Sequence, residues 1–223
     1  MSRGDFGPFW LSLQVASLAT AIIVTFGTPL GWLLARTRFP GKGLLSGMMT
    51  LPLVLPPTVI GYGLLLFLGR RGWAGRWLDQ AFGVSVAFHW SGAVIASAVM
   101  AAPMFVIPVR GAFAGVDPNL ENAARLLGRG EFSVFWSITI PLSWRGFASG
   151  LVLTFARALG EFGATLMLAG NIPDRTRTAA LAIYDAVLDD QPTLAGVYCA
   201  LIGSTSLVAV LIAQRTQTSG SPR

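Results

Sequence analysis

Long, nearly uncharged runs of apolar residues constrain this chain more than any other feature. A helix needs roughly 20 apolar residues to cross the hydrocarbon core of a membrane. Five stretches reach this length, residues 9–35, 44–69, 88–109, 147–170 and 193–213. Only 12% of the residues are charged, about half the share in an average soluble domain. We therefore predict an all-α, polytopic membrane protein with about five transmembrane helices, forming a single domain over residues 1–223.

The distribution of basic residues predicts how the chain is oriented. Five spans place the two termini on opposite sides of the membrane. If the N-terminus lies outside, the inner segments carry more Lys and Arg than the outer ones, as the positive-inside rule requires, and the formal net charge of +6 falls on the inner face. We predict an outer N-terminus and a cytoplasmic C-terminus. In such a chain a basic balance reflects topology and contact with anionic membrane lipid, not nucleic acid.

Cysteine and histidine are too scarce to support metal or disulfide chemistry. The sequence contains one cysteine, Cys199, and one histidine, His89. A single cysteine cannot form an intramolecular disulfide, and one residue of each kind does not make a transition-metal site. We predict no metal ligands and no catalytic residues.

Prolines interrupt the second apolar run, "LPLVLPPTVIGYG". Each proline removes a backbone donor and disturbs the preceding helical turn. Inside a membrane, broken helix is tolerated only where it is buried in protein or lines a cavity. Two interpretations stay open: a kink that merely fits the neighbouring helices, or a hinge or pathway-lining element formed by Pro56, Pro57 and Thr58.

The fourth run, "TFARALGEFGATLML", contains two charges that are costly inside a membrane. Arg157 and Glu161 are four residues apart, on one face of a helix, and Thr154 and Thr165 continue the same stripe. A charge near the bilayer centre costs about 2.5–3.5 kcal/mol, so we expect this stripe to face the interior of the protein. The pair is either an ion pair that fixes helix packing, or an anion-handling arginine or conformational switch in a translocation pathway. An intramembrane enzyme with Glu161 as acid or base would lack a nucleophile or metal.

The longest inner segment contains a short helix with signals at both ends. Asp117 is a good N-cap, Pro118 suits the first helical position, and Gly128 is typical just past a helix C-terminus. These signals predict a helix over Pro118–Leu127, which is too short to be stable without packing. The face expected to pack consists of Leu120, Ala123, Ala124 and Leu127.

A second helix is predicted to follow Gly130 and to end at Pro141. Its large apolar side chains should point toward the bilayer and tie the loop to the spans. These side chains are Phe132, Phe135, Trp136 and Ile140.

The same loop resembles a signature of ABC importer permeases, E-A-A, three residues, Gly, nine residues, I-x-L-P. Here Ala123 and Ala124 are followed by three residues, Gly128, nine residues, and then "ITIP" ending at Pro141. Asn122 stands at the glutamate position, directly after Glu121, and isoleucine replaces the leucine.

The resemblance implies a type I ABC importer permease fold, in which loop 115–141 carries a coupling helix that binds a cytoplasmic ATPase subunit. The residues it assigns to coupling are Glu121, Ala123, Ala124, Arg125, Gly128 and Pro141.

Further stretches are similar to the permease subunits of bacterial molybdate importers, with sulfate and thiosulfate permeases as nearest relatives. They are "LPLVLPPTVIGYGLLLFLG", "FARALGEFGATLMLAGNIP" and "TAALAIY". This resemblance implies an inner-membrane homodimer that works with two ATPase subunits and an extracytoplasmic molybdate-binding protein. The sequence has no G-x-x-x-x-G-K-[ST] motif, so ATP and magnesium would bind the partner ATPase. Tungstate, sulfate or thiosulfate remain alternative substrates. A passive anion channel would leave the loop signature unexplained.

Overall fold

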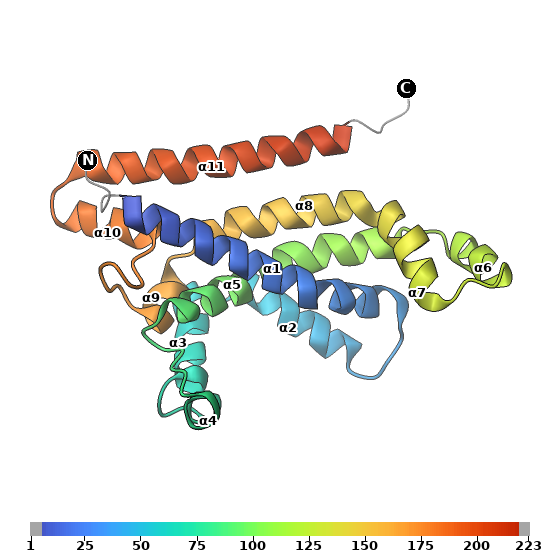
Figure 1. Ribbon diagram of the computed structural model, residues 1–223, viewed down its shortest axis with the longest axis horizontal. Helices are drawn as coiled ribbons and strands as arrows, with labels where there is room; N and C mark the ends of the chain where they lie inside the picture. The colour runs from blue at the N-terminus through green and yellow to red at the C-terminus, as the bar shows by residue number, and fades with distance from the viewer. Residues whose placement is uncertain (1–5, 219–223) are drawn as a thin grey trace.

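All regular structure that the computed structural model describes, over residues 6–218, is helical (Figure 1). Residues 1–5 and 219–223, and with them the two chain ends, lie outside the described residues. The helices are α1 (Gly7–Arg36), α2 (Lys42–Val54), α3 (Pro57–Leu68), α4 (Trp73–Phe82), α5 (Trp90–Ala114), α6 (Pro118–Leu126), α7 (Glu131–Val134), the π-helix η2 (Phe135–Thr139), α8 (Ile140–Leu159), α9 (Gly163–Ala169), α10 (Ala179–Leu188) and α11 (Pro192–Thr218).

Three long helices, α1, α5 and α8, form the core of the molecule. α5 is central, because it packs on both α1 and α8, and 67% of the residues in its most apolar stretch are buried. Phe105 and Phe113 of α5 are fully buried and both pack edge-on against Phe147 of α8. Small residues let the helices approach, as is common between membrane helices: Gly27 of α1 and Gly150 of α8 both face Phe105.

Three helices, α1, α5 and Pro192–Ile212 within α11, are long and apolar enough to cross a membrane, and the number rises to five if two bent helix pairs each count as one span. The prediction of an all-α polytopic protein is therefore confirmed. α11 lies along α8 and α10 (Figure 1) and is the least buried candidate span, with 11% of its apolar window buried.

The second apolar run forms two helices, not one straight span. The chain direction bends by 118° between α2 and α3. Pro56 is the N-cap of α3 and Pro57 its first residue, so the helix breaks where two consecutive residues lack the N–H that would continue it. α3 and α4 project from the bundle on one side (Figure 1).

The prediction that Pro141 ends the second loop helix was wrong. Helix runs from Glu131 through η2 and α8 to Leu159. The π-helical turn lies directly before Ile140 and Pro141. Its wider turn shifts the hydrogen-bonding register there, so the proline, which has no N–H, is accommodated in the first turn of α8.

Candidate functional site

The loop over residues 115–141 holds α6 at one end of the long axis of the molecule, while α10 and the beginning of α1 lie at the other end (Figure 1). α6 starts as predicted, because Asp117 Oδ1 accepts a hydrogen bond from the Asn119 N–H at 2.9 Å and Pro118 is the first helical residue. It ends at Leu126, one residue earlier than predicted. Gly128 has a φ of +80°, a left-handed conformation that favours glycine.

Glu121 is the charged residue of α6 that turns into the protein, with 6% of its surface exposed. Its Oε1 accepts hydrogen bonds from Arg36 Nη2 at 2.9 Å and from Thr139 Oγ1 at 2.7 Å. Arg36 is the last residue of α1 and Thr139 the last of η2. We call Arg36, Glu121 and Thr139 the Glu121 network. Sequence reasoning missed Arg36 and Thr139; the one local signal was that Arg36 directly follows a span.

The apolar face of α6 is largely open to solvent. Leu126 is 89% and Leu127 85% exposed, whereas Ala124 is buried at 7%. Of the face predicted to pack, Leu120, Ala123, Ala124 and Leu127, this chain buries Ala124 alone, so the packing of the other three stays a prediction that requires a partner. The cause is the Glu121 network, which turns the side of α6 that carries Glu121 and Ala124 inward. The leucines form a surface that this chain does not itself cover.

A second ion pair fixes α6 relative to α7. Arg125 Nε lies 2.6 Å from Glu131 Oε1, and its Nη2 donates to Glu131 Oε2 at 3.0 Å. The third arm of the guanidinium donates to Asn122 Oδ1 at 2.8 Å. The hydrogen bonds from Arg125 lower the pKa of the exposed Glu131 carboxyl, and the same contact raises the pKa of Arg125. Such bidentate pairs fix geometry as well as charge.

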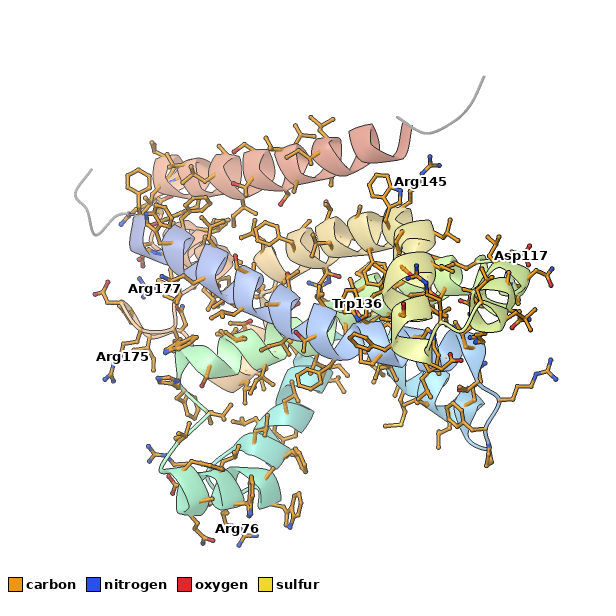
Figure 2. The ribbon with its side chains drawn as sticks, turned by 45° about the vertical axis from the view of Figure 1, so that its right-hand side comes forward. Arg76, Asp117, Trp136, Arg145, Arg175 and Arg177 are labelled. Carbon is orange, nitrogen blue, oxygen red and sulfur yellow. The ribbon has the colours of Figure 1, made fainter. Side chains whose placement is uncertain are left out.

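One aromatic side chain anchors α7 and η2 to the bundle. Phe135 packs against Trp32 of α1, with ring centroids 6.3 Å apart, and against Phe113 of α5 at 6.0 Å. Phe132 and Trp136 are exposed by 78% and 56%, whereas Ile140, like Phe135, packs against the core. Of the four side chains predicted to tie the loop to the spans, Phe135 and Ile140 therefore do so. Figure 2 shows Asp117 on the side of the molecule opposite Arg175 and Arg177, with Trp136 between them.

The charged pair of the fourth run lies at a helix break. Arg157 Nη1 is 2.7 Å from Glu161 Oε2. Glu161 is 2% exposed, and its Oε1 accepts a hydrogen bond from the Ala164 N–H at 2.9 Å. The prediction of one continuous helical stripe was wrong: α8 ends at Leu159, α9 starts at Gly163, and the pair of helices is bent by 60°. Glu161 therefore joins α8 to the first turn of α9. The N-terminus of a helix also stabilises a nearby carboxylate.

The α2–α3 break, which carries the prolines, lies beside the α8–α9 break, which carries the charged pair. A Cβ built on Gly163 would meet the Pro57 side chain at 3.0 Å and the Thr58 backbone nitrogen at 3.5 Å. Pro57 and Thr58, like Pro56, are exposed. The residues proposed for a pathway thus converge from α3 and from the α8–α9 break. The hydroxyls of Thr154 and Thr165 are buried and form no hydrogen bond in the structure.

The segment before α10, at the other end of the molecule, is held by its own polar contacts. Arg177 pairs with Asp185 at 3.0 Å, and Asn171 donates to the same carboxylate at 2.7 Å. Within residues 6–218, His, Cys, Asp and Glu nowhere gather in a group of three or more that could hold a metal ion.

Comparison with known proteins identifies the family. Residues 27–217 match the family described as "Binding-protein-dependent transport system inner membrane component". The chain belongs to this family. It is 52% identical over 177 residues to the molybdenum transport system permease protein ModB of Escherichia coli (strain K12), and the match covers 79% of this chain and 77% of that one. ModB of Azotobacter vinelandii is 40% identical over 188 residues, covering 84% and 83%.

Solved structures of other ABC transporters share the fold of this inner membrane component. One chain of the methionine transporter MetNI, in an inward-facing conformation, matches with a TM-score of 0.74 and 16% identity over 100% of both chains. A chain of a bacterial importer of the acidic polysaccharide alginate matches with a TM-score of 0.77 and 16% identity, covering 100% of this chain and 82% of that one. The predicted ABC importer permease fold is confirmed.

Proposed function

We propose that this chain is the transmembrane permease subunit of an ATP-driven importer of molybdate. The observation that carries the proposal is the 52% identity to a molybdenum transport permease over 79% of the chain, combined with an inner loop that presents a rigid helix to solvent. A second relative with the same description is 40% identical over 84% of the chain.

α6 is the proposed coupling helix. The exposed leucines at its end, Leu126 and Leu127, form an apolar surface suited to a groove on a cytoplasmic ATPase subunit. Ala123, Arg125 and Gly128 lie on the same exposed loop or at its edge. ATP and magnesium would bind that partner, and its closure would move α6.

A second copy of the chain is proposed to complete the membrane unit. α3 exposes large apolar side chains, among them Tyr62, Leu66 and Phe67, each more than half exposed. This exposed apolar face of α3 lies beside the contact of α3 with α9. It could pack against the same face of a second copy, so that the pathway would run between the two copies. An extracytoplasmic molybdate-binding protein would deliver the oxyanion to the end that carries α10.

The pathway is proposed to pass the α2–α3 and α8–α9 breaks. Exposed Thr58, directly after Pro56 and Pro57, offers its hydroxyl as a donor to a tetrahedral dianion, and Arg157, with 28% of its side chain exposed, supplies a positive charge. The Glu161 carboxylate beside it keeps the net charge of the pair near zero, which suits a site that must release its ion. Rigid-body rocking between two packed states would expose this region to each side in turn.

The proposed orientation places α6 and α7 in the cytoplasm, the N-terminus outside and the C-terminus inside. It is supported by the excess of basic residues in the segments at the α6 end and by the family's description as an inner membrane component.

Uptake of radiolabelled molybdate tests the proposal. The chain is expressed with its cognate ATPase and binding protein in a bacterial strain that lacks its own molybdate permease. ATP-dependent uptake that is inhibited by unlabelled molybdate more strongly than by sulfate is expected. Stronger inhibition by sulfate or thiosulfate would assign it to those oxyanions, comparison with tungstate separates the closest analogue, and uptake without ATP would identify a passive channel.

A further inference from the structure

The Glu121 network joins four parts of the chain at one buried carboxylate. Arg36 Nη2 donates to Glu121 Oε1 at 2.9 Å and also to the Val116 carbonyl oxygen at 3.0 Å, in the segment between α5 and α6. Thr139 donates to the same carboxylate oxygen at 2.7 Å. Arg125 is the other charged group nearby, 3.9 Å from Glu121 Oε2. The end of α1, the α5–α6 connection, α6 and η2 therefore meet here.

The side chains of this network are shielded from water. Those of Arg36 and Glu121 are 17% and 8% exposed. Salt and water screen such a pair weakly, and removing one partner leaves the other charge buried without compensation. The contact is therefore stiff compared with the exposed Arg125–Glu131 pair, where the carboxylate is 72% exposed.

α6 is not adjacent to α1 in the sequence, so the link between these two helices depends on side-chain contacts. α6 is joined by short segments to α5 and to α7, and it packs against α7 and η2. α1 packs along α5 and α8, and its last residue reaches α6 through the Glu121 carboxylate, across a separation of 85 residues in sequence. Through Arg36, a force applied to α6 is passed directly to the first membrane helix.

We infer that Glu121 is a positioning residue that couples α6 to α1 through Arg36, with Thr139 fixing the carboxylate, so that a displacement of α6 moves α1 together with α5 and α8. The inference rests on the proposed function, because it requires a partner that moves α6. It gives Glu121 a role inside the permease: its side chain is buried toward Arg36, whereas the exposed leucines of α6 remain for the ATPase.

The test compares ATP hydrolysis with molybdate uptake in the complete complex, reconstituted in lipid vesicles with its ATPase and binding protein. Glu121→Gln keeps the shape of the side chain and an oxygen for Thr139 but removes the charge; Arg36→Gln removes the other half of the pair. We expect uptake per ATP hydrolysed to fall about tenfold in each, with the rate of hydrolysis changed less than about twofold.

A matched variant serves as the control. Arg38→Gln removes an exposed arginine two residues from Arg36. It should keep uptake per ATP within about twofold of the unmodified complex, since an exposed charge contributes little.

A charge-swapped pair, Arg36→Glu with Glu121→Arg, separates transmission from folding. It should recover a large part of the uptake per ATP that the single substitutions lose, because the buried charges are again paired. A purely structural role would lower hydrolysis and uptake in parallel with the yield of assembled complex, and this result would overturn the inference. Unchanged uptake per ATP in Glu121→Gln would do the same.

If Glu121→Gln assembles poorly, the charge-swapped pair is the deciding variant. If the swapped complex assembles and recovers uptake per ATP, the inference is supported. If it assembles but does not recover uptake per ATP, the inference is overturned. Failure of the proposed function is distinguishable, since the unmodified complex would then show no ATP-dependent molybdate uptake.

Discussion

Gly61 of α3 lies directly against the backbone of Ala164 in α9. A Cβ built on Gly61 would come within 2.7 Å of the Ala164 Cα and 2.9 Å of its carbonyl oxygen. Rotation of a side chain cannot relieve contacts with backbone atoms, so the two helices would have to separate. This close approach holds the projecting α3 on the bundle next to the candidate pathway.

Replacing Gly61 by alanine should destabilise the protein by about 1–3 kcal/mol, the usual cost of overpacking a tight contact. Gly63→Ala is the matched control, because a Cβ there meets no atom within 4 Å and alanine favours helix. Thermal unfolding of the detergent-solubilised protein measures both. Equal melting temperatures for the two variants would contradict the packing described here.

Removing Arg157 should be more damaging than neutralising the whole pair. Arg157→Ala leaves the buried Glu161 carboxylate without its partner at 2.7 Å, which costs about 3 kcal/mol or more. Adding Glu161→Gln removes the uncompensated charge while keeping an oxygen for the Ala164 N–H. The double variant should regain stability in thermal unfolding. If it also regains uptake, the pair is structural; if it folds and does not transport, the pair acts in the pathway.

Gly128→Pro should uncouple hydrolysis from uptake, because proline requires a φ near −65° and Gly128 has +80°. Proline would also remove the hydrogen bond from the Gly128 N–H to the Arg125 carbonyl, 2.9 Å long. Gly130→Pro is the matched control, since Gly130 already has a φ of −72°. The ratio of uptake to ATP hydrolysis is the measurement. A larger loss in Gly130→Pro would contradict the assigned loop geometry.

Neighbouring alanines of α6 should respond differently to a larger side chain. Ala124 is buried at 7%, so Ala124→Leu should push α6 from the bundle and lower the melting temperature of the isolated permease. Ala123 is exposed, so Ala123→Leu should leave that temperature unchanged but weaken co-purification with the ATPase. Unaltered ATPase binding in Ala123→Leu would argue against this face as the docking surface.

The Arg125–Glu131 pair should survive mild acid. Since the contact lowers the pKa of Glu131 below the ordinary value of about 4.3, its stabilisation is present above that ordinary value and is lost as the pH falls through the lower, folded-state pKa. Carbon-13 resonance titration of Glu131 measures its midpoint. Arg125→Gln should raise the midpoint; an unchanged midpoint would show that Arg125 does not cause the shift.

Local signals in the sequence were sufficient to predict the helical elements of the site. Asp117 and Gly128 delimit α6 to within one residue of the observed helix, because caps act through backbone groups only a few residues away. The break of the second run also follows from its prolines, which act on their own turn.

The contacts that give these elements their orientation were not predictable in the same way. Glu121 meets Arg36 across 85 residues and Thr139 across 18, and no periodicity reports such a meeting. The apolar pattern of α6 predicted which residues form a packing face, but not that a buried carboxylate would turn Glu121 and Ala124 toward the bundle. At Pro141 the π-helical turn, which depends on surrounding packing, overrode a strong local stop signal.

The break between α2 and α3 also has a consequence for biogenesis. The carbonyl groups that Pro56 and Pro57 leave without helical donors are costly in lipid, and the helix that supports α3 there is α9, made only after α5 and the inner loop have left the ribosome. The second segment therefore enters the bilayer before the helix that α3 packs against exists, and the contact between α3 and α9 can form only once α9 has been made.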